Sequence, residues 1–547
     1  MPQPQPLQSD ALSNAPLSFR RGRLVDLCIL AVIAGLWCWW FYADVTRILP
    51  VAFDTFRDSA AAENVLADRW LSDPAIVDQP YWYAPLGPIV FACISRLTGI
   101  APLIVYSSSI LWLNVLLPFA WYLLARYWCD RWTALAGVLL IIFGSRWWTI
   151  GVALPMTSVQ GVLLLTITLI AWLAALRAKT RVGAAAVGFL LAFCTWTHII
   201  SGIIAAGTIG LHALACARAG SYSNDGHDHT KRHRHEAVRR MVLIAVVCAG
   251  LVAPLAWHLM RLPHVNLHSI EFVSPLLRDH AYALQSATPL VPLLGLVGLI
   301  LAWRDRGEKT GMLLAYAAVG LAGQAWGYAS LLTGGSLPIL IPHEFQWNFQ
   351  IAIGMSAAYA LAGLAAKVAA LLRSKPRVQT CTRVALLALI VYLATGSEVS
   401  LARPLQSQAW HSTAPWYRTS LREAIDWINS NTSIDDVVFS PHPFNYTFVG
   451  GATGRKLVGV PVGQANIAVD TQARVRDAER LESTHDPAEF AALLDKYDVK
   501  YVLLLEEHEE LRQRWRDWDV LEPVFRTDSG AADIWRIKKG RPPAAQR

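Results

Sequence analysis

The chain has 547 residues, of which 54% are hydrophobic and 16% are charged, and its formal net charge is +8. Soluble domains usually carry about 25% charged residues, whereas a window of about 20 apolar residues is long enough to cross a bilayer. Many such windows occur here, so the composition excludes an ordinary soluble protein and predicts an all-α polytopic membrane bundle surrounded by lipid.

The first apolar run covers residues 24–43 and follows a short arginine-rich tail, residues 1–23. The run has no small-residue cleavage site, so we interpret it as a retained span and not as a signal peptide. The tail before it is expected in the cytoplasm. A polar first outer loop, residues 44–102, comes next.

Two carboxylates of this loop, Asp54 and Asp58, are four residues apart and would share one face of a short helix. The apolar residues 51–53 place Asp54 near the hydrocarbon edge, where burial raises the pKa of a carboxylate and a neighbouring cation lowers it. Such a group suits a catalytic base, a metal ligand or an anchor for a sugar hydroxyl. The alternative is an N-cap followed by a solvated helix face.

The first outer loop ends with three aromatic residues, Tyr81, Trp82 and Tyr83. Aromatic faces can stack on sugar rings, although an aromatic belt at the membrane interface is the commoner use. The apolar stretch that follows, residues 86–97, is only about 12 residues long. It is too short to cross the bilayer and suits a helix lying in the interface.

Apolar runs predict about eleven spans in total, and Lys and Arg cluster on one side of them. The amino terminus is therefore expected in the cytoplasm and the carboxyl terminus outside, in a bacterial cytoplasmic membrane. The positive net charge reports this topology and does not imply a nucleic-acid partner. Spans after the first are predicted at residues 103–125, 132–148, 158–177, 183–199, 200–217, 240–260, 288–303, 311–331, 347–372 and 384–402.

This topology gathers further chemically capable residues at the outer surface. His198 ends one span, where an ionisable residue is costly and often functional, with a hydrogen-bonded structural histidine as the alternative. His343 and Glu344 enter another span from outside, and the helix dipole alone would favour the acid there. Arg278 lies in an outer loop, where it could pair with a phosphate or anchor the interface.

After residue 402 the composition becomes that of a soluble domain, and none of the eight cysteines lies there. Alternating helices and strands indicate an extracytoplasmic α/β domain over residues 403–547, following a membrane module over residues 24–402. Helices are predicted at residues 421–429, 465–482 and 488–496, and strands at residues 437–440, 501–505 and 530–537.

Together these features resemble the GT-C superfamily of integral-membrane glycosyltransferases. The resemblance rests on Asp54-x-x-x-Asp58, on the aromatic-Pro-Leu entry to an interfacial helix, on His198, and on Gly454-Arg455-Lys456 and residues 494–501 in the outer domain. It implies a sugar linked to polyprenyl phosphate as the donor. It also implies that Asp54 is the catalytic acid residue, and that Asp58 stands where relatives carry a histidine or a second acid.

The leaving lipid phosphate would need a cation, supplied by Arg278, His343 or a divalent metal ion. Relatives that bind a metal through an acid in the second outer loop differ from this chain, because residues 148–158 contain none. Metal dependence is therefore left open. No W-W-D-Y-G-type segment occurs, which argues against an oligosaccharyltransferase acting on Asn sequons.

The sequence thus predicts an inverting glycosyltransferase that moves one sugar onto a glycan, lipid or protein acceptor on the outer face. A transporter or flippase for a lipid-linked glycan would instead need charged residues deep in spans and internal repeats. A polysaccharide polymerase or ligase would place its large polar loop between late spans. A membrane scaffold without catalysis would leave the acid pair unexplained.

Overall fold

The computed structural model describes most of the chain, and the fold below refers to those parts. They are residues 19–47, 53–143, 154–219, 227–262, 289–305, 307–333, 342–371, 421–441, 449–460 and 468–538, together with Asn466 and scattered positions between 380 and 392.

Long apolar helices pack into a bundle, and helices occupy every predicted span except 384–402, which lies mostly outside the described residues. One of them, residues 102–125, is a continuous helix built from α5 (Pro102–Ser109), the π-helical turn η1 (Ile110–Asn114) and α6 (Leu116–Ala125). The others are α2 (Phe19–Arg47), α7 (Arg131–Phe143), α9 (Thr157–Ala178), α10 (Arg181–Thr197), α11 (Ile199–Ala219), α12 (His227–Met260), α14 (Leu290–Asp305), α15 (Glu308–Leu332) and α16 (Pro342–Leu371).

Several of these helices have the length and the surface of membrane spans. Among the described residues, five helices are long and apolar enough to cross a bilayer. The apolar part of α12 is only 11% buried, and it exposes large side chains such as Val242, Val246 and Trp257. Apolar surface on this scale is unfavourable in water and natural against lipid. The chain is therefore a multi-pass membrane protein, although the number of spans stays a prediction.

Small residues let the spanning helices approach closely. A methyl group added to Gly298 of α14 would lie 1.8 Å from the backbone oxygen of Ser356 on α16. One added to Gly137 of α7 would lie 2.6 Å from the side chain of Ala358. Close backbone approach of this kind drives helix association in lipid, where apolar burial alone gives no advantage.

The π-helical turn is bound to the first span. Trp37 of α2 donates its indole N–H to the backbone oxygen of Ile110, at 2.8 Å. Asn114, at the other end of the turn, donates to the backbone oxygen of Leu154 at 3.0 Å. Widened turns of this kind often occur at functional sites, because they displace backbone groups from the regular helical pattern.

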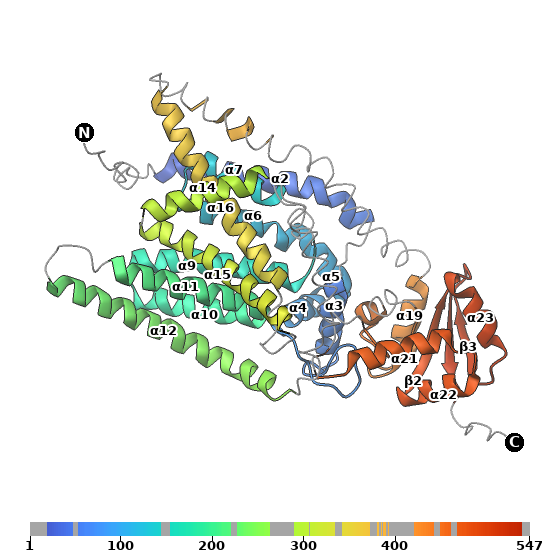
Figure 1. Ribbon diagram of the computed structural model, residues 1–547. Coiled ribbons are helices and arrows are strands. Elements are labelled where there is room, and N and C mark those ends of the chain that lie inside the picture. Colours follow the sequence, from blue (N-terminus) through green and yellow to red (C-terminus); the bar gives the residue numbers. More distant parts are fainter. Residues whose placement is uncertain are drawn as a thin grey trace.

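Residues 53–98 contribute two helices, which lie between the bundle and the carboxyl-terminal elements (Figure 1). The first is α3 (Phe53–Leu66), which carries both carboxylates of the acid pair. The second is α4 (Leu86–Thr98), which ends at Gly99 with a left-handed φ of 71°. Its 13 residues match the predicted interfacial stretch, and its position in the interface stays a prediction.

The carboxyl-terminal elements build a mixed sheet with the order β1-β2-β4-β3, in which β1 and β2 are parallel and the other pairs are antiparallel. Phe439, Phe490 and Trp515 are buried in its core. The elements are α19 (Leu421–Asn431), β1 (Val437–Phe439), α21 (Thr471–Ser483), α22 (Pro487–Lys496), β2 (Val499–Leu505), η4 (Glu506–His508), α23 (Glu509–Arg516), β3 (Leu521–Arg526) and β4 (Ala532–Ile537).

Two details of this region differ from the sequence-based expectation. Helix α21 begins at Thr471 and not at 465, because the side chain of Asp470 caps it by accepting from the backbone N–H of Ala473 at 3.0 Å. Strand β3 and helix α23 were not expected. Pro523 lies inside β3, next to an irregularity in the ladder, and proline is tolerated in a strand only at such edge positions.

Candidate active site

The acid pair of α3 encloses an arginine. Arg57 places Nη1 3.4 Å from Oδ1 of Asp54, and it donates from Nε and Nη2 to Oδ1 of Asp58 at 3.0 and 2.8 Å. The three residues share one helical turn, as the four-residue spacing of the acids predicts. The structure therefore brings the two predicted carboxylates together around a cation.

The second oxygen of Asp58 is occupied by another segment. Oδ2 accepts hydrogen bonds from the backbone N–H of Thr157, at 3.1 Å, and from its hydroxyl group. Thr55 reinforces this junction by donating to the backbone oxygen of Pro155 at 2.8 Å. These contacts dock α3 on the start of α9. Thr157 had not been recognised as a site residue from the sequence.

The two carboxylates differ in exposure. The side chain of Asp58 is 0% exposed, whereas that of Asp54 is 32% exposed. Asp54, which the sequence places near the hydrocarbon edge, is thus partly exposed, whereas the contacts with Thr157 help to bury Asp58. Burial acts to lower the pKa of Arg57, but the charges of Asp54 and Asp58 outweigh it and hold that pKa well above its ordinary value.

Tyr83 covers the guanidinium group. The carbon Cζ of Arg57 lies 4.1 Å from the centre of the Tyr83 ring, a cation–π contact. Burial raises the pKa of Tyr83 well above its ordinary value, so the phenol is neutral at physiological pH. Trp82 packs edge-on against Tyr83, with 5.4 Å between the ring centroids. The ring of His198 lies on another side, 6.2 Å from that of Tyr83.

His198 and Glu344 meet inside the bundle. Nε2 of His198 lies 3.4 Å from Oε1 of Glu344, and both residues are buried. On the other side of the ring, Nδ1 of His198 lies 2.8 Å from the hydroxyl oxygen of Ser201 and 3.3 Å from the backbone nitrogen of Ser201. Gly161 makes room for this pair, since a methyl group there would lie 2.4 Å from Cβ of His198.

The remaining sequence candidates are placed differently. Tyr81 is 3% exposed, and its backbone oxygen lies 2.6 Å from Nε2 of His258 at the end of α12. Arg278 lies outside the described residues. His343 belongs to the first turn of α16, but its side chain is not described.

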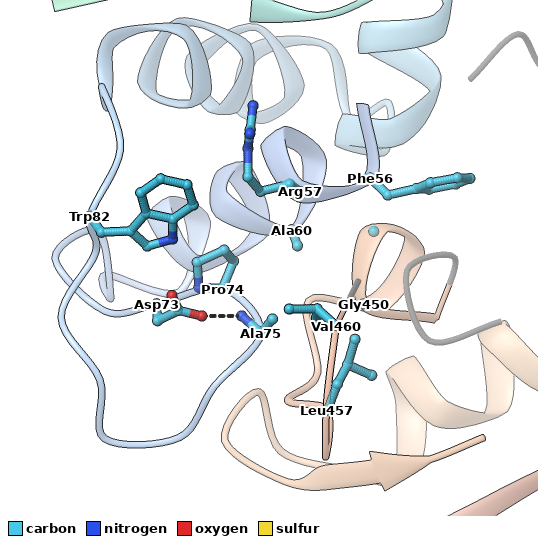
Figure 2. Close-up of a pocket in the computed structure, with 11 residues that line it drawn as sticks. Phe56, Arg57, Ala60, Asp73, Pro74, Ala75, Trp82, Gly450, Leu457 and Val460 are labelled. Atoms are coloured by element: carbon cyan, nitrogen blue, oxygen red, sulfur yellow. Dashed lines mark hydrogen bonds between the residues drawn. The ribbon is translucent and has the colours of Figure 1, made fainter. Parts of the chain in front are cut away.

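A small pocket lies beside Arg57, between α3 and residues 450–460 of the carboxyl-terminal elements. Figure 2 shows Trp82 on one side of this pocket and Gly450, Leu457 and Val460 on the other, whereas the side chain of Arg57 extends away from Leu457 and Val460. The other lining residues are Phe56, Ala60, Asp73, Pro74, Ala75 and Gly451.

A buried polar network closes the junction beside the pocket. Lys456 is 2% exposed, and its Nζ donates to the side-chain oxygen of Asn64 at 3.2 Å and to the backbone oxygen of Asp73 at 2.7 Å. The carboxylate of Asp73 accepts from the side chain of Asn466 at 2.9 Å. Lys456 belongs to the Gly454-Arg455-Lys456 motif of the sequence, but the motif alone does not predict that the lysine is buried in this network.

The donor set around α3 does not fit a divalent metal ion. The two oxygens of Asp58 already accept hydrogen bonds from Arg57 and Thr157, and the guanidinium group fills the space between Asp58 and Asp54. Within the described residues, no group of three or more His, Cys, Asp or Glu side chains is arranged to hold a metal. The cation of this site is therefore an arginine of the chain itself.

No protein-family model matches the sequence, and no curated protein is similar enough in sequence to be recognised as a relative. Solved structures, however, share the fold. The archaeal oligosaccharyltransferase AglB from Archaeoglobus fulgidus, in complex with an inhibitory peptide and a dolichol-phosphate, superposes with a TM-score of 0.58 at 13% identity, covering 95% of this chain and 75% of that one.

Two bacterial structures are similarly close. ArnT from Cupriavidus metallidurans, bound to undecaprenyl phosphate, has a TM-score of 0.52 at 13% identity and covers 94% of this chain and 97% of that one. The arabinofuranosyltransferase AftD from mycobacteria has a TM-score of 0.59 at 14% identity, and the match covers 93% of this chain but only 40% of AftD. The chain therefore has the fold of the GT-C membrane glycosyltransferases, as the sequence motifs predicted.

Proposed function

We propose that the protein is a membrane glycosyltransferase that moves a sugar from a polyprenyl-phosphate carrier to a hydroxyl group of an acceptor outside the cytoplasmic membrane. The fold is that of enzymes whose solved structures contain dolichol-phosphate or undecaprenyl phosphate. A donor whose head group already lies outside the membrane requires no nucleotide-sugar site. None of the sequence patterns typical of such a site occurs.

Asp54 is the proposed general base. It removes the proton of the acceptor hydroxyl while that oxygen attacks the anomeric carbon, the bond from this carbon to the phosphate oxygen breaks, and polyprenyl phosphate leaves. A single displacement of this kind inverts the anomeric configuration. The observation that carries the assignment is the accessibility of Asp54, because the other carboxylate of the pair is sealed by Arg57 and Thr157.

The neighbouring residues have supporting roles in this proposal. Arg57 orients Asp54 through their ion pair, and Asp58 holds Arg57 in place by accepting two hydrogen bonds from it. The leaving phosphate is proposed to meet Arg278 or His343. The proposed substrate contacts also include Tyr81, Trp82, Tyr83, His198 and Glu344.

The experiment is transfer of radiolabel from a panel of polyprenyl-phosphate sugars in membranes that contain the protein. Parent membranes should convert at least one donor into a labelled acceptor product. Asp54→Asn keeps the size of the side chain but removes its basicity, so the rate should fall by about 10²–10⁴-fold.

Melting temperature and expression of the Asp54→Asn protein serve as the control for folding. If the variant is fully folded and its turnover stays near that of the parent, Asp54 is not the base. If no donor on the panel is consumed by the parent, the proposed activity itself is wrong.

A further inference from the structure

Thr157 completes the set of contacts that holds the acid pair of α3. We infer that Thr157 is a positioning residue of the active site. Its hydroxyl group fixes Asp58, Asp58 fixes Arg57, and Arg57 fixes the proposed base Asp54. This inference rests on the proposed function, since a positioning role in catalysis requires that Asp54 acts on a substrate.

Each lone pair of the Asp58 carboxylate has a donor. Oδ1 accepts from Nε and Nη2 of Arg57 at 3.0 and 2.8 Å, and Oδ2 accepts from the backbone N–H of Thr157 at 3.1 Å and from its hydroxyl group. A carboxylate offers about four such positions. Because the side chain of Asp58 is 0% exposed, bulk water cannot supply a substitute donor. Without the hydroxyl group of Thr157, Asp58 can satisfy its charge only by moving.

The start of α9 holds Thr157 firmly. Thr157 is the first residue of this helix, and the preceding Met156 makes no capping hydrogen bond with its side chain. The carboxylate of Asp58 takes the place of the cap, and the helix dipole favours a negative charge there. Thr157 is 0% exposed, and a methyl group added to Gly87 of α4 would lie 3.3 Å from both Oγ1 and Cγ2 of the threonine. Its side chain is therefore confined between α3 and α4.

A second contact joins the same two segments independently of the Thr157 hydroxyl group. Thr55, which is 0% exposed, donates to the backbone oxygen of Pro155 at 2.8 Å. This bond and the backbone N–H of Thr157 both remain when the hydroxyl group is removed. A change of Thr157 can therefore alter the orientation of Asp58 without separating α3 from α9.

A single guanidinium group carries the position of Asp58 to Asp54. Arg57 donates two hydrogen bonds to Asp58 and places Nη1 3.4 Å from Oδ1 of Asp54. The guanidinium group is planar and rigid, so a displacement at its Asp58 side also moves its Asp54 side. A misplacement of about 1 Å can cost about 100-fold in rate, because proton transfer requires the base to lie within hydrogen-bond reach.

The first experiment measures sugar transfer by variants of the full-length protein. Thr157→Val keeps the shape and the backbone N–H but removes the hydroxyl group, so kcat should fall by about tenfold or more while the donor KM stays within about twofold. Thr157→Ser keeps the hydroxyl group, so its kcat should stay within about threefold of the parent. Thr157→Ala should give the same loss as Thr157→Val, which keeps the test independent of the folding of one variant.

Thr168→Val is the matched control, because it removes a buried hydroxyl group from the same helix about 16 Å further along. Thr168 is 0% exposed and donates to the backbone oxygen of Leu164 at 2.7 Å. This variant should keep the kcat of the parent. Equal losses of kcat in Thr157→Val and Thr168→Val would overturn the inference, and so would a loss that Thr157→Ser does not rescue.

The second experiment needs no substrate. Full-length protein labelled with ¹⁵N-arginine should show a nuclear magnetic resonance signal from Nε–H of Arg57, which its loss in Arg57→Gln identifies. This group donates to the buried Asp58, so its hydrogen should exchange slowly with water. Thr157→Val should accelerate the exchange by about tenfold or more, whereas Thr168→Val should leave it unchanged.

The two measurements distinguish this inference from the proposed function. If Thr157→Val accelerates exchange at Arg57 but the parent transfers sugar from no donor, the proposed function is wrong and the contacts from Thr157 to Arg57 stand. If the parent transfers sugar but either kcat or exchange ignores Thr157→Val, the proposed function stands and the inference is wrong. Unchanged exchange overturns the inference whether or not transfer is seen.

Discussion

Two buried cations contact α3, and they have different electrostatic environments. Arg57 lies between two carboxylates, Asp54 and Asp58. Lys456 donates to neutral oxygens, the amide of Asn64 and the backbone oxygen of Asp73, and the nearby Asp73 carboxylate bonds to other groups. Both cations contact oxygens of residues 54–73. Only Arg57 forms ion pairs with carboxylates, whereas Lys456 donates to uncharged oxygens.

The pKa values of the two cations show what this difference does. Burial acts to lower both, but the two adjacent carboxylates hold the pKa of Arg57 above its ordinary value. Burial lowers the pKa of Lys456 to about 8, with the charge of Asp73 offsetting only part of it. The first site therefore keeps a permanent charge beside an accessible acid. The second is a sealed junction whose charge can change near neutral pH.

The largest expected effect on stability is that of removing the cation between the carboxylates. Arg57→Gln leaves the fully buried Asp58 without its ion pair, which should cost about 3–5 kcal/mol of unfolding free energy. Arg69→Gln is the matched control, since Arg69 is 55% exposed and pairs with a half-exposed Asp435, a contact worth about 1 kcal/mol or less. Thermal unfolding in detergent compares them, and equal losses would contradict the special role of Arg57.

The junction lysine should matter less. Lys456→Met fits the same space but leaves the side-chain oxygen of Asn64 without this donor, at a cost of about 1–3 kcal/mol, whereas the backbone oxygen of Asp73 still accepts from Asn64. Lys538→Met is the control, because Lys538 is 42% exposed. Melting temperature and protease sensitivity report the loss. A variant as stable as its control would mean that the junction does not depend on the lysine.

Glu63 of α3 should give the junction a measurable pH dependence. Burial raises the pKa of Glu63 from 4.5 to about 7, although Arg455 opposes the shift. The folded chain therefore binds this proton more tightly than the unfolded chain. The stability that it adds is full below pH 4.5 and is lost as the pH rises through 7. Glu63→Gln should remove this loss. As the pH rises from 4.5 to 7, the unfolding free energy of the variant should therefore increase relative to that of the parent.

Unfolding measured across that pH range tests the claim. Glu479→Gln, an exposed change in α21, should follow the parent curve. A Glu63→Gln curve parallel to that of the parent would mean that Glu63 ionises equally well in the folded and unfolded chains.

The smallest expected effect is that of removing divalent metal ions, which should not change the rate of sugar transfer. Because Arg57 occupies the space between the carboxylates, a chelator such as EDTA should leave sugar transfer unchanged, and Mn²⁺ should show no binding that Asp54→Asn removes. Transfer rates and electron paramagnetic resonance of the purified protein measure the two parts. Transfer that EDTA abolishes and Mn²⁺ restores would overturn the arginine's role as the resident cation.

Local patterns predicted what depends on neighbours in sequence. Asp54 and Asp58 share a turn of α3 because a four-residue spacing places side chains on one helix face. The helices within the predicted spans follow from the length of their apolar runs. In the outer region, the alternation of helices with strands identified α19, β1, α22 and β2 at nearly their observed bounds.

Contacts between distant segments could not be predicted in this way. Asp58 is sealed by Thr157, which is 99 residues away in the sequence, so nothing near Asp58 revealed which acid would be buried. His198 and Glu344 were each singled out, but their ion-pair distance emerges only when α16 packs beside the end of α10. Lys456 reaches Asn64 across 392 residues.

The hydrogen bond between Trp37 and the π-helical turn helps to set where α3 begins relative to the bundle. This bond joins α2 to the helix of residues 102–125, and only residues 48–52 separate the end of α2 from the start of α3. A linker of this length reaches about 20 Å at most. The distance from Asp54 to the end of α2 is thereby limited, and shortening that linker should draw Asp54 towards α2.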